Sequence, residues 1–334
     1  MTAPAYVTRE TVLDVGGFGS SMASKIDRAI FSRSRYIERR THRHFYPKTA
    51  AVTYDDPQRI TSMYDGYGLH LERDLRSVTT VTVGGTATSD YTALPKGGPP
   101  YNRLIVSGPP SLDLVITGVW GWSADTEAAG TITGDIASTT ATTCDCSNSA
   151  AIGVGDLITI NSERMIVTDK TPIDTTEDLD GALQAQTDNV TVTVTDGSGF
   201  TAGEEILVDA ERMLIEDVTG NDLTVQRAHR GSTLAAHSTA ADVYAYRRLH
   251  IDRGAAGSTA DTHNTSDTIT RNVPPPEIRD WCLAEVLNQV AQEAGGYARV
   301  VGSGDNQREA RGPALADLRK SVGGQYRRVR MGTA

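Results

Sequence analysis

The sequence predicts an α+β fold: a small helical domain with antiparallel strands, into which an all-β module is inserted. Three observations carry this prediction. Glycine occurs 32 times among 334 residues while aromatic residues make up only 6%, a composition that favours short strands and turns. Apolar stripes at helical spacing stand near both ends of the chain. Between them, short alternating apolar segments contain an internal repeat.

The first expected element is a helix over residues 20–43. Its basic residues occupy the faces opposite an apolar stripe, and those in the last turn suit the negative end of the helix dipole. We expect Ser20 or Ser21 to cap this helix and Pro47 to prevent its continuation. The preceding "VGGFGSS" lacks the spacing and the lysine of a phosphate-binding loop and predicts a turn. The stripe consists of Ile26, Ile30, Arg33 or Ser34, Ile37 and Thr41.

Antiparallel strands are expected next, because short alternating segments here end at Gly, Pro or Asp. They cover residues 69–75 and 77–85, the segments "SDYTALP" and "RLIVSG", and residues 112–122.

The C-terminal flank predicts two helices and a basic tail. The segment "NVPPPEIRDWCLAEVLNQVAQEAGG" starts with prolines, continues with an apolar stripe and stops at a glycine pair. After a loop, "ALADLRKSV" predicts a short helix. The tail "GGQYRRVRMGTA" follows, and we expect Gly323 and Gly324 to free it from that helix.

The internal repeat aligns "IGVGDLITINSERMIVTD" (residues 152–169) with "FTAGEEILVDAERMLIED" (residues 200–217) without a gap. Each copy predicts a β-hairpin, with Glu-Arg-Met between its two apolar strands. Because a lone hairpin is barely stable in water, the two copies are expected to pack together or share a sheet.

Charge is segregated along the chain, whose formal net charge is −10. Residues 123–250 hold 21 acidic against 7 basic residues, residues 25–48 hold 8 basic against 2 acidic, and residues 299–330 hold 8 against 3. Such segregation indicates at least two physically separate regions. We expect that a short Gly/Ser linker can replace residues from about 123 to 270 and leave the flanking domain folded.

Motifs for catalysis or metal binding are not found. There is no G-x-S-x-G, Walker, H-E-x-x-H or paired-carboxylate motif, and the "CDC" of Cys144 and Cys146 has no second ligand pair. We therefore expect no enzyme activity, no cofactor, no metal and no disulfide framework. There is also no apolar run long enough to cross a membrane and no secretory signal. Arg227, His229, Arg230 and His237 are interpreted as a loop ordered by local hydrogen bonds.

The flanks, in their order, are similar to a known family. The helix ending "IERRTHRHFYP", the strand set ending "VITGVWGW", the helix start "VPPPEIRDW" and the ending "YRRVR" resemble the head-to-tail connector (adaptor) proteins of tailed bacteriophages. The resemblance covers roughly residues 5–122 and 272–330. In that family the strand and the proline-led helix are usually close together, so the resemblance implies a discontinuous connector domain, residues 1–122 and 271–334. Residues 123–270 are then an inserted β module with a duplication at 147–171 and 195–219.

The resemblance implies a structural virion protein assembled in the host cytoplasm and placed at the head–tail interface. It implies a ring, commonly of twelve subunits, that extends the DNA channel from the portal protein toward the stopper or tail. Double-stranded DNA would pass without sequence-specific binding, since net negative charge repels phosphates. We expect Tyr326, Arg327, Arg328 and Arg330 to bind the portal. We expect Arg39, Arg40, Arg43, Phe45 and Tyr46 to lie in the subunit interface or core, with the two aromatic rings against the sheet.

Other classes of function stay open at this point. The acidic repeat could belong to another phage tail or surface binding protein, although residues 123–250 contain few aromatic residues that could form a binding platform. A DNA-binding role for residues 25–48 is opposed by the overall acidity and by the lack of a recognised DNA-binding signature.

Overall fold

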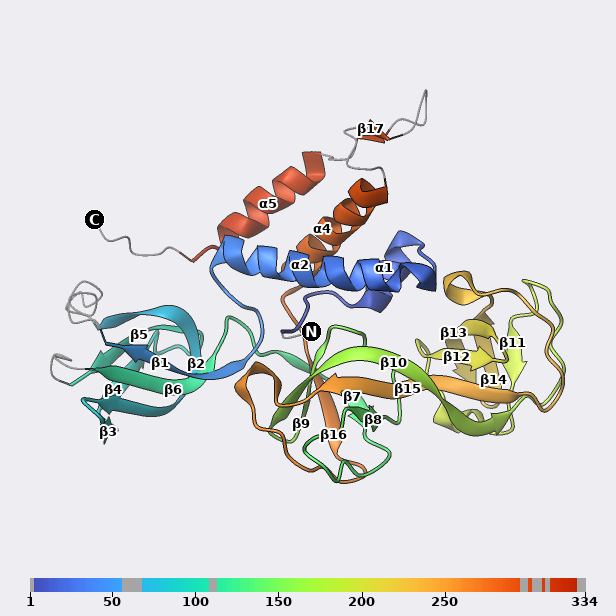
Figure 1. Ribbon diagram of the computed structural model, residues 1–334, viewed down its shortest axis with the longest axis horizontal. Helices are drawn as coiled ribbons and strands as arrows, with labels where there is room; N and C mark the ends of the chain where they lie inside the picture. Colours follow the sequence, from blue (N-terminus) through green and yellow to red (C-terminus); the bar gives the residue numbers. More distant parts are fainter. Residues whose placement is uncertain are drawn as a thin grey trace.

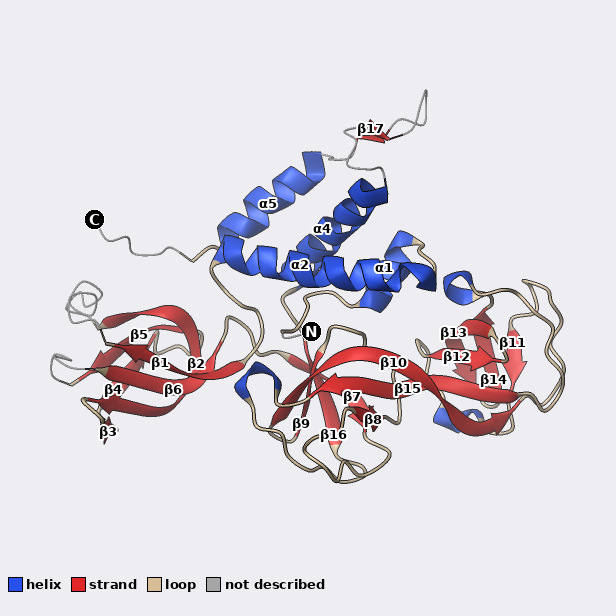
Figure 2. Ribbon diagram, viewed as in Figure 1, coloured by secondary structure: helices blue, strands red, loops and turns tan. Residues whose placement is uncertain are grey.

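The fold is α+β, with four helices among the described residues and two large antiparallel sheets. The computed structural model describes residues 3–55, 68–107, 113–294, 300–301, 308–309 and 313–328. The helices form one group, the helical unit, which lies above the two sheets (Figures 1 and 2). The smaller sheet lies at the left of this view and the larger one extends from the centre to the right.

The helical unit contains α2, the helix expected at residues 20–43, and α1, which was not expected. The stripe on α2 is confirmed, since Ile26, Ile30, Ser34, Ile37 and Thr41 are all buried. The expected serine cap is wrong: the 3-10 turn Ser20–Met22 precedes α2, and the residue before α2 makes no side-chain cap hydrogen bond. The helices are α1 (Arg9–Gly16), α2 (Ala23–Thr41), α4 (Pro276–Ala294) and α5 (Pro313–Gln325).

Aromatic residues fill the core of the helical unit. Phe45 is fully buried, and its ring packs edge-on against Tyr6 and Tyr326. Tyr46 is also buried and lies beside Tyr6. The two rings thus pack in the helical core with the N-terminal segment and the end of the chain, rather than against the sheet as expected.

The small sheet has the strand order β1-β6-β2-β5-β4, with β3 paired to β2. The two strands expected at 69–75 and 77–85 form the single strand β2, whose register shifts where it pairs with β6. β1 was not expected. The strands are β1 (Lys48–Tyr54), β2 (Leu69–Val83), β3 (Thr86–Thr88), β4 (Tyr91–Leu94), β5 (Tyr101–Val106) and β6 (Leu114–Trp120). A separate two-stranded pair joins β17 (Val300–Val301) to β18 (Arg308–Glu309).

The large sheet has ten strands in the order β11-β14-β13-β12-β15-β10-β9-β16-β7, with β8 on β15. Both hairpins expected from the repeat are confirmed as β9–β10 and β12–β13, and they share this sheet as expected. The strands are β7 (Thr126–Thr131), β8 (Thr143–Asp145), β9 (Leu157–Ile160), β10 (Glu163–Asp178), β11 (Thr191–Thr193), β12 (Glu205–Val208), β13 (Glu211–Thr219), β14 (Asp222–Gln226), β15 (Asp242–Asp252) and β16 (Thr268–Asn272).

The duplication is longer than the aligned hairpins and is nested. Each half of the large sheet has its own core: copy one comprises residues 129–169 and 249–269, and copy two comprises residues 179–245. In the sequence, copy two is therefore inserted between the two segments of copy one. In space it lies at the far end of the long β10–β15 pair (Figure 1). In copy two the corresponding strands β13 and β14 are joined directly by a two-residue turn.

Copy one also packs into the helical unit. Leu157 and Ile166, from β9 and β10, belong to the core that the helices form. The N-terminal segment runs across copy one so closely that a Cβ on Gly153 would lie 2.5 Å from Thr8. The carboxylate of Glu10 accepts a hydrogen bond from the backbone of Val154 at 2.8 Å. Copy one and the helices thus share a core.

Candidate functional site

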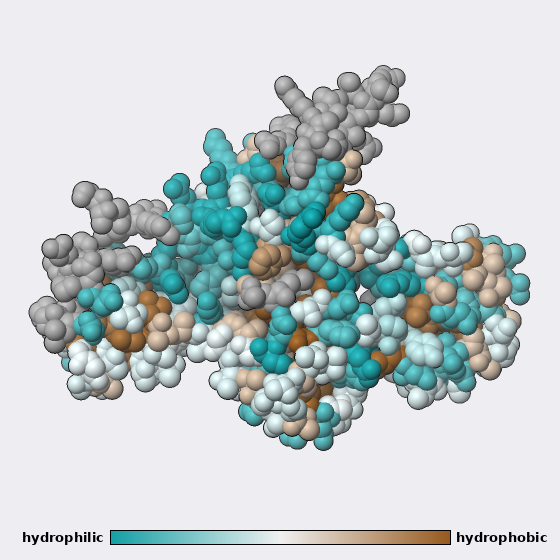
Figure 3. All heavy atoms as spheres, viewed as in Figure 1, coloured by the Kyte–Doolittle hydropathy of each residue, from teal (hydrophilic) through white to brown (hydrophobic). Residues whose placement is uncertain are grey.

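A groove lined by basic residues lies between the end of α2 and α5. We call it the basic groove; its volume is about 500 Å³. It brings together basic residues from two segments near opposite ends of the chain. On the face shown in Figure 3, hydrophilic side chains gather over α2 and α5. The lining residues are Arg39, Arg40, His42, Ala316, Arg319, Lys320, Gly323, Gly324 and Arg327.

The groove exists because α5 continues through two glycines. The expectation that Gly323 and Gly324 release the tail is wrong, since α5 extends to Gln325. A Cβ on Gly323 would lie 3.3 Å from the indole of Trp281, so a side chain there would crowd the packing of α5 on α4. Close helix packing outweighs the low helix propensity of glycine.

Arg319 fixes the floor of the basic groove. Its guanidinium donates two hydrogen bonds to the carboxylate of Glu285, at 2.6 and 2.8 Å. Glu285 is fully buried on α4 and also accepts from the indole of Trp281 at 3.0 Å. This bidentate pair is structural, because it neutralises a buried carboxylate.

The other cations of the basic groove are unneutralised. The side chains of Arg39, Arg40, Lys320 and Arg327 are exposed, and none of them makes an ion pair within the part of the chain that the structure describes. By contrast, many arginines elsewhere in the molecule hold carboxylates. The groove is thus a concentration of unpaired positive charge in a chain of net charge −10, and such a surface has the electrostatic character that suits an acidic group.

Two of the predicted site residues instead join the helical unit to the small sheet. Arg328 donates to Asp74 of β2 at 2.7 Å, and its backbone donates to Thr41. Arg43 lies 3.3 Å from the same carboxylate and stacks over Trp122 at 3.9 Å. Burial raises the pKa of Asp74, while Arg328 and Arg43 oppose that shift.

Of the four residues assigned to portal binding, only Arg327 is exposed in the structure. Tyr326 is buried and donates to Glu277 at 3.1 Å, and Arg328 is held by Asp74. Arg330 lies outside the described residues. A free tail beginning after Val322 is therefore wrong at least as far as Arg328, since this stretch is helical or anchored.

Each copy of the large sheet contains a buried Glu–Arg–His cluster. In copy two, Glu211 accepts two hydrogen bonds from Arg227, both at 2.8 Å, and one from His237 at 2.9 Å. Two backbone N–H groups complete its shell. In copy one, Glu163 is bound in the same way by Arg253, His263 and two backbone N–H groups.

The electrostatics of the two clusters indicate structural ion pairs. Burial alone would raise the pKa of Glu163 and Glu211, but the hydrogen bonds from arginine, histidine and backbone outweigh it and hold both at about 2. No serine, threonine or cysteine side chain is bound to either histidine within the described residues. The loop interpretation of Arg227 and His237 thus missed their partner, Glu211. The sequence carries the signal, because "RAHRGSTLAAH" and "RGAAGSTADTH" share the pattern R-x3-G-S-T-x3-H.

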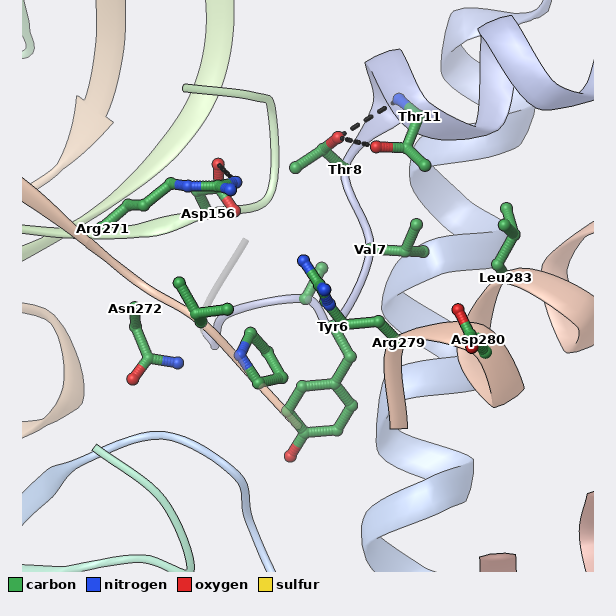
Figure 4. Close-up of a pocket in the computed structure, with 13 residues that line it drawn as sticks. Tyr6, Val7, Thr8, Thr11, Asp156, Arg271, Asn272, Arg279, Asp280 and Leu283 are labelled. Atoms are coloured by element: carbon green, nitrogen blue, oxygen red, sulfur yellow. Dashed lines mark hydrogen bonds and ion pairs between the residues drawn. The ribbon is translucent and has the colours of Figure 1, made fainter. Parts of the chain in front are cut away.

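A smaller cavity of about 140 Å³ lies where the N-terminal segment, the large sheet and α4 meet (Figure 4). Two of its charged groups are already engaged: Asp156 accepts from the Gly153 backbone at 2.8 Å and lies 3.8 Å from Arg271, which also pairs with Glu127. Burial raises the pKa of Asp156 to about 6. We interpret this cavity as a junction between packed units.

No protein-family model, curated protein or solved structure matches this chain. Within the described residues, no group of three or more His, Cys, Asp or Glu side chains could hold a metal ion. No described helix combines the length and the apolar character needed to span a bilayer.

Proposed function

We propose that this chain is a structural virion protein: a head-to-tail adaptor of a tailed bacteriophage that forms a ring below the portal. In this proposal, residues 1–122 and 271–334 form the connector domain and residues 123–270 are an inserted β module. The ring extends the DNA channel toward the stopper or tail. The proposed family rests on the resemblance of the flanks to connector proteins. The proposed contact surface between subunits is the basic groove.

The observation that carries the proposal is the basic groove. Rings are built from heterologous contacts, in which one patch of a subunit meets a different patch of the next. Unpaired arginines suit such a contact, because a planar guanidinium binds a carboxylate with two hydrogen bonds. Passing DNA is a poor occupant for the groove, since the acidic remainder of the chain repels phosphates at long range.

The portal contact is assigned to Arg327 among the described residues. Truncation after Val322 is not a clean test of this assignment, because it also removes Tyr326 and Arg328, which anchor the fold. Arg327→Glu leaves those anchors in place. We expect this variant to lose binding to the portal protein while its circular dichroism spectrum stays unchanged; equal binding would remove the assignment.

Negative-stain electron microscopy of the purified protein, alone and mixed with its portal protein, tests the function as a whole. Closed rings, alone or seated on the portal, are the expected result. Two outcomes would reject the adaptor function. One is a monomer under every condition; the other is tight binding to duplex DNA with a log–log salt slope of about −0.9 per phosphate contact.

A further inference from the structure

A second charged feature, of opposite sign, lies where β10 and β15 run into copy two. We call it the acidic turn; it comprises Asp174, Glu177, Asp178 and Asp242. All four side chains are exposed or half-exposed. The strand register shifts between Asp174 and Glu177, and Thr176 between them has a left-handed φ of 65°. This irregular backbone gathers the carboxylates around one strand end.

The acidic turn is electrostatically unfavourable in the isolated subunit. Asp178 and Asp242 are direct cross-strand neighbours, and like charges in that position destabilise a sheet. Desolvation, followed by the charges of Asp242, Asp174 and Glu177, raises the pKa of Asp178. None of the four makes an ion pair within the residues that the structure describes, and the turn offers no metal site there. The acidic turn therefore carries unbalanced negative charge.

The basic groove has the complementary imbalance. It presents four exposed cations without acidic partners, and the acidic turn presents four carboxylates without basic partners. The two features lie in different parts of the molecule: the groove beside α2 and α5, and the turn beside the β11–β14 strands at the right of Figure 1. Two distant, complementary patches on one chain have the arrangement that a head-to-tail contact requires.

We propose that the acidic turn of one subunit occupies the part of the basic groove formed by Arg39 and Arg40 of the next, and that Arg327 is left to the portal. This inference rests on the proposed ring and names its contact: Asp178 and Asp242 of one copy face Arg39 and Arg40 of its neighbour. Copy two is then an arm that reaches the adjacent subunit. Because these charges are solvent-exposed, salt weakens the contact.

A charge exchange tests this contact. The groove variant is Arg39→Glu with Arg40→Glu, and the turn variant is Asp178→Lys with Asp242→Lys. Each variant alone is expected to remain monomeric at concentrations where the unaltered protein assembles, as measured by sedimentation velocity. An equimolar mixture is expected to assemble, because every contact then joins opposite charges. Lys96→Glu and Glu216→Lys, which change exposed charges elsewhere, should assemble as the unaltered protein does.

The possible outcomes separate the two proposals. If both variants assemble like the unaltered protein, or if the mixture stays monomeric, this contact is wrong while a ring built through other surfaces stands. If the unaltered protein forms no ring, alone or on the portal, the adaptor function fails as well. Circular dichroism spectra matching the unaltered protein establish that each variant is folded. In the supporting case, assembly of the unaltered protein falls at least tenfold between 50 mM and 500 mM salt.

Discussion

The two copies of the duplicated module have the same buried cluster and different loops. In each copy a glutamate at the start of a strand binds an arginine, a histidine ten residues further on, and two backbone N–H groups. The loop between that arginine and histidine differs at several positions, among them the second and third after the arginine. Copy one carries Ala255 and Ala256 there, and copy two carries His229 and Arg230.

Each loop contacts a different neighbour. In copy one, the loop lies against β1, where a Cβ on Gly257 would be 2.0 Å from the backbone oxygen of Thr49. In copy two, Arg230 donates to Asp14 of α1 at 3.1 and 3.2 Å. The shared cluster therefore stabilises the fold of each copy. The sequence of the loop determines which neighbouring element the copy contacts.

The largest expected effect comes from removing both copies together. Replacing residues 123–270 by a Gly/Ser linker removes Leu157 and Ile166 from the helical core. Each lost side chain lowers the free energy of unfolding by about 2–5 kcal/mol. We therefore revise the expectation that this region is removable: the remaining chain should lack a cooperative thermal transition.

Removing copy two alone should be tolerated. Thr171 pairs with Arg248 across the sheet, as Thr219 pairs with Asp222 around the two-residue turn of copy two. Replacing residues 172–247 by Gly-Asn copies that turn and keeps the core of copy one. Calorimetry should show one cooperative transition. Loss of that transition would mean that the copies are not nested units.

The buried glutamates give the next largest effect. Glu211→Ala leaves Arg227 buried and unpaired, and Glu163→Ala leaves Arg253 in the same state; each should cost about 3–5 kcal/mol in urea unfolding. Glu216→Ala on the exposed face of β13 is the control, expected within about 0.5 kcal/mol. A large effect in only one copy would show that the clusters are not equivalent.

Glu163 and Glu211 also predict how the stability of the protein depends on acid pH. The folded pKa of both glutamates is about 2, below the ordinary value of 4.5. Their contribution is therefore complete above pH 4.5 and is lost as the pH falls from there toward 2. Glu163→Gln and Glu211→Gln together should flatten this part of the stability profile, and an unchanged profile would contradict the shifts.

Smaller effects are expected in the loops. Gly257 and its counterpart Gly231 both have a left-handed φ, of 73° and 78°. Alanine at either position should cost about 1–2 kcal/mol for that conformation. Gly257→Ala must in addition displace the Thr49 backbone, whereas Gly231→Ala meets its nearest atom at 3.5 Å. Urea unfolding should rank Gly257→Ala as clearly the more damaging; equal costs would disprove the docking of copy one on β1.

The smallest effect is expected for Arg230→Ala, which gives copy two the residue found at Ala256 in copy one. The variant loses the partly exposed pair with Asp14 and the buried pair with Glu205, although Glu205 stays paired with Arg212 at 2.9 Å. A loss of about 1 kcal/mol is expected, and it should shrink at high salt. A loss that salt does not alter would mean that Arg230 acts through packing.

The sequence predicts best those elements whose pattern is local. The α2 stripe and the two hairpins follow from periodicity within a few residues. By contrast, α1 buries only Val12 and Leu13, too few for a visible stripe. The continuation of α5 through Gly323 depends on the surface of Trp281, which no local rule describes. The basic groove needed that continuation, so its two halves were assigned separate roles.

The nesting was missed for a different reason. The two hairpins follow one another in the chain, but the second half of copy one follows all of copy two. The pattern R-x3-G-S-T-x3-H occurs twice in the sequence, but in reversed order. Its first occurrence completes the second hairpin, and its second occurrence completes the first hairpin. Interrupted repeats of this kind are found only when order along the chain is not assumed.

Nesting also sets an order of events in folding. Glu211 and Arg227 are 16 residues apart, whereas Glu163 and Arg253 are 90 residues apart. Closing the shorter loop costs less chain entropy, so copy two is expected to form first. Once formed, it holds the facing strands β10 and β15 together and brings the distant halves of copy one within reach. During synthesis the same order holds, because copy two is complete before Arg253 is added. The innermost segment of the chain thus acts as the nucleus for the units that surround it.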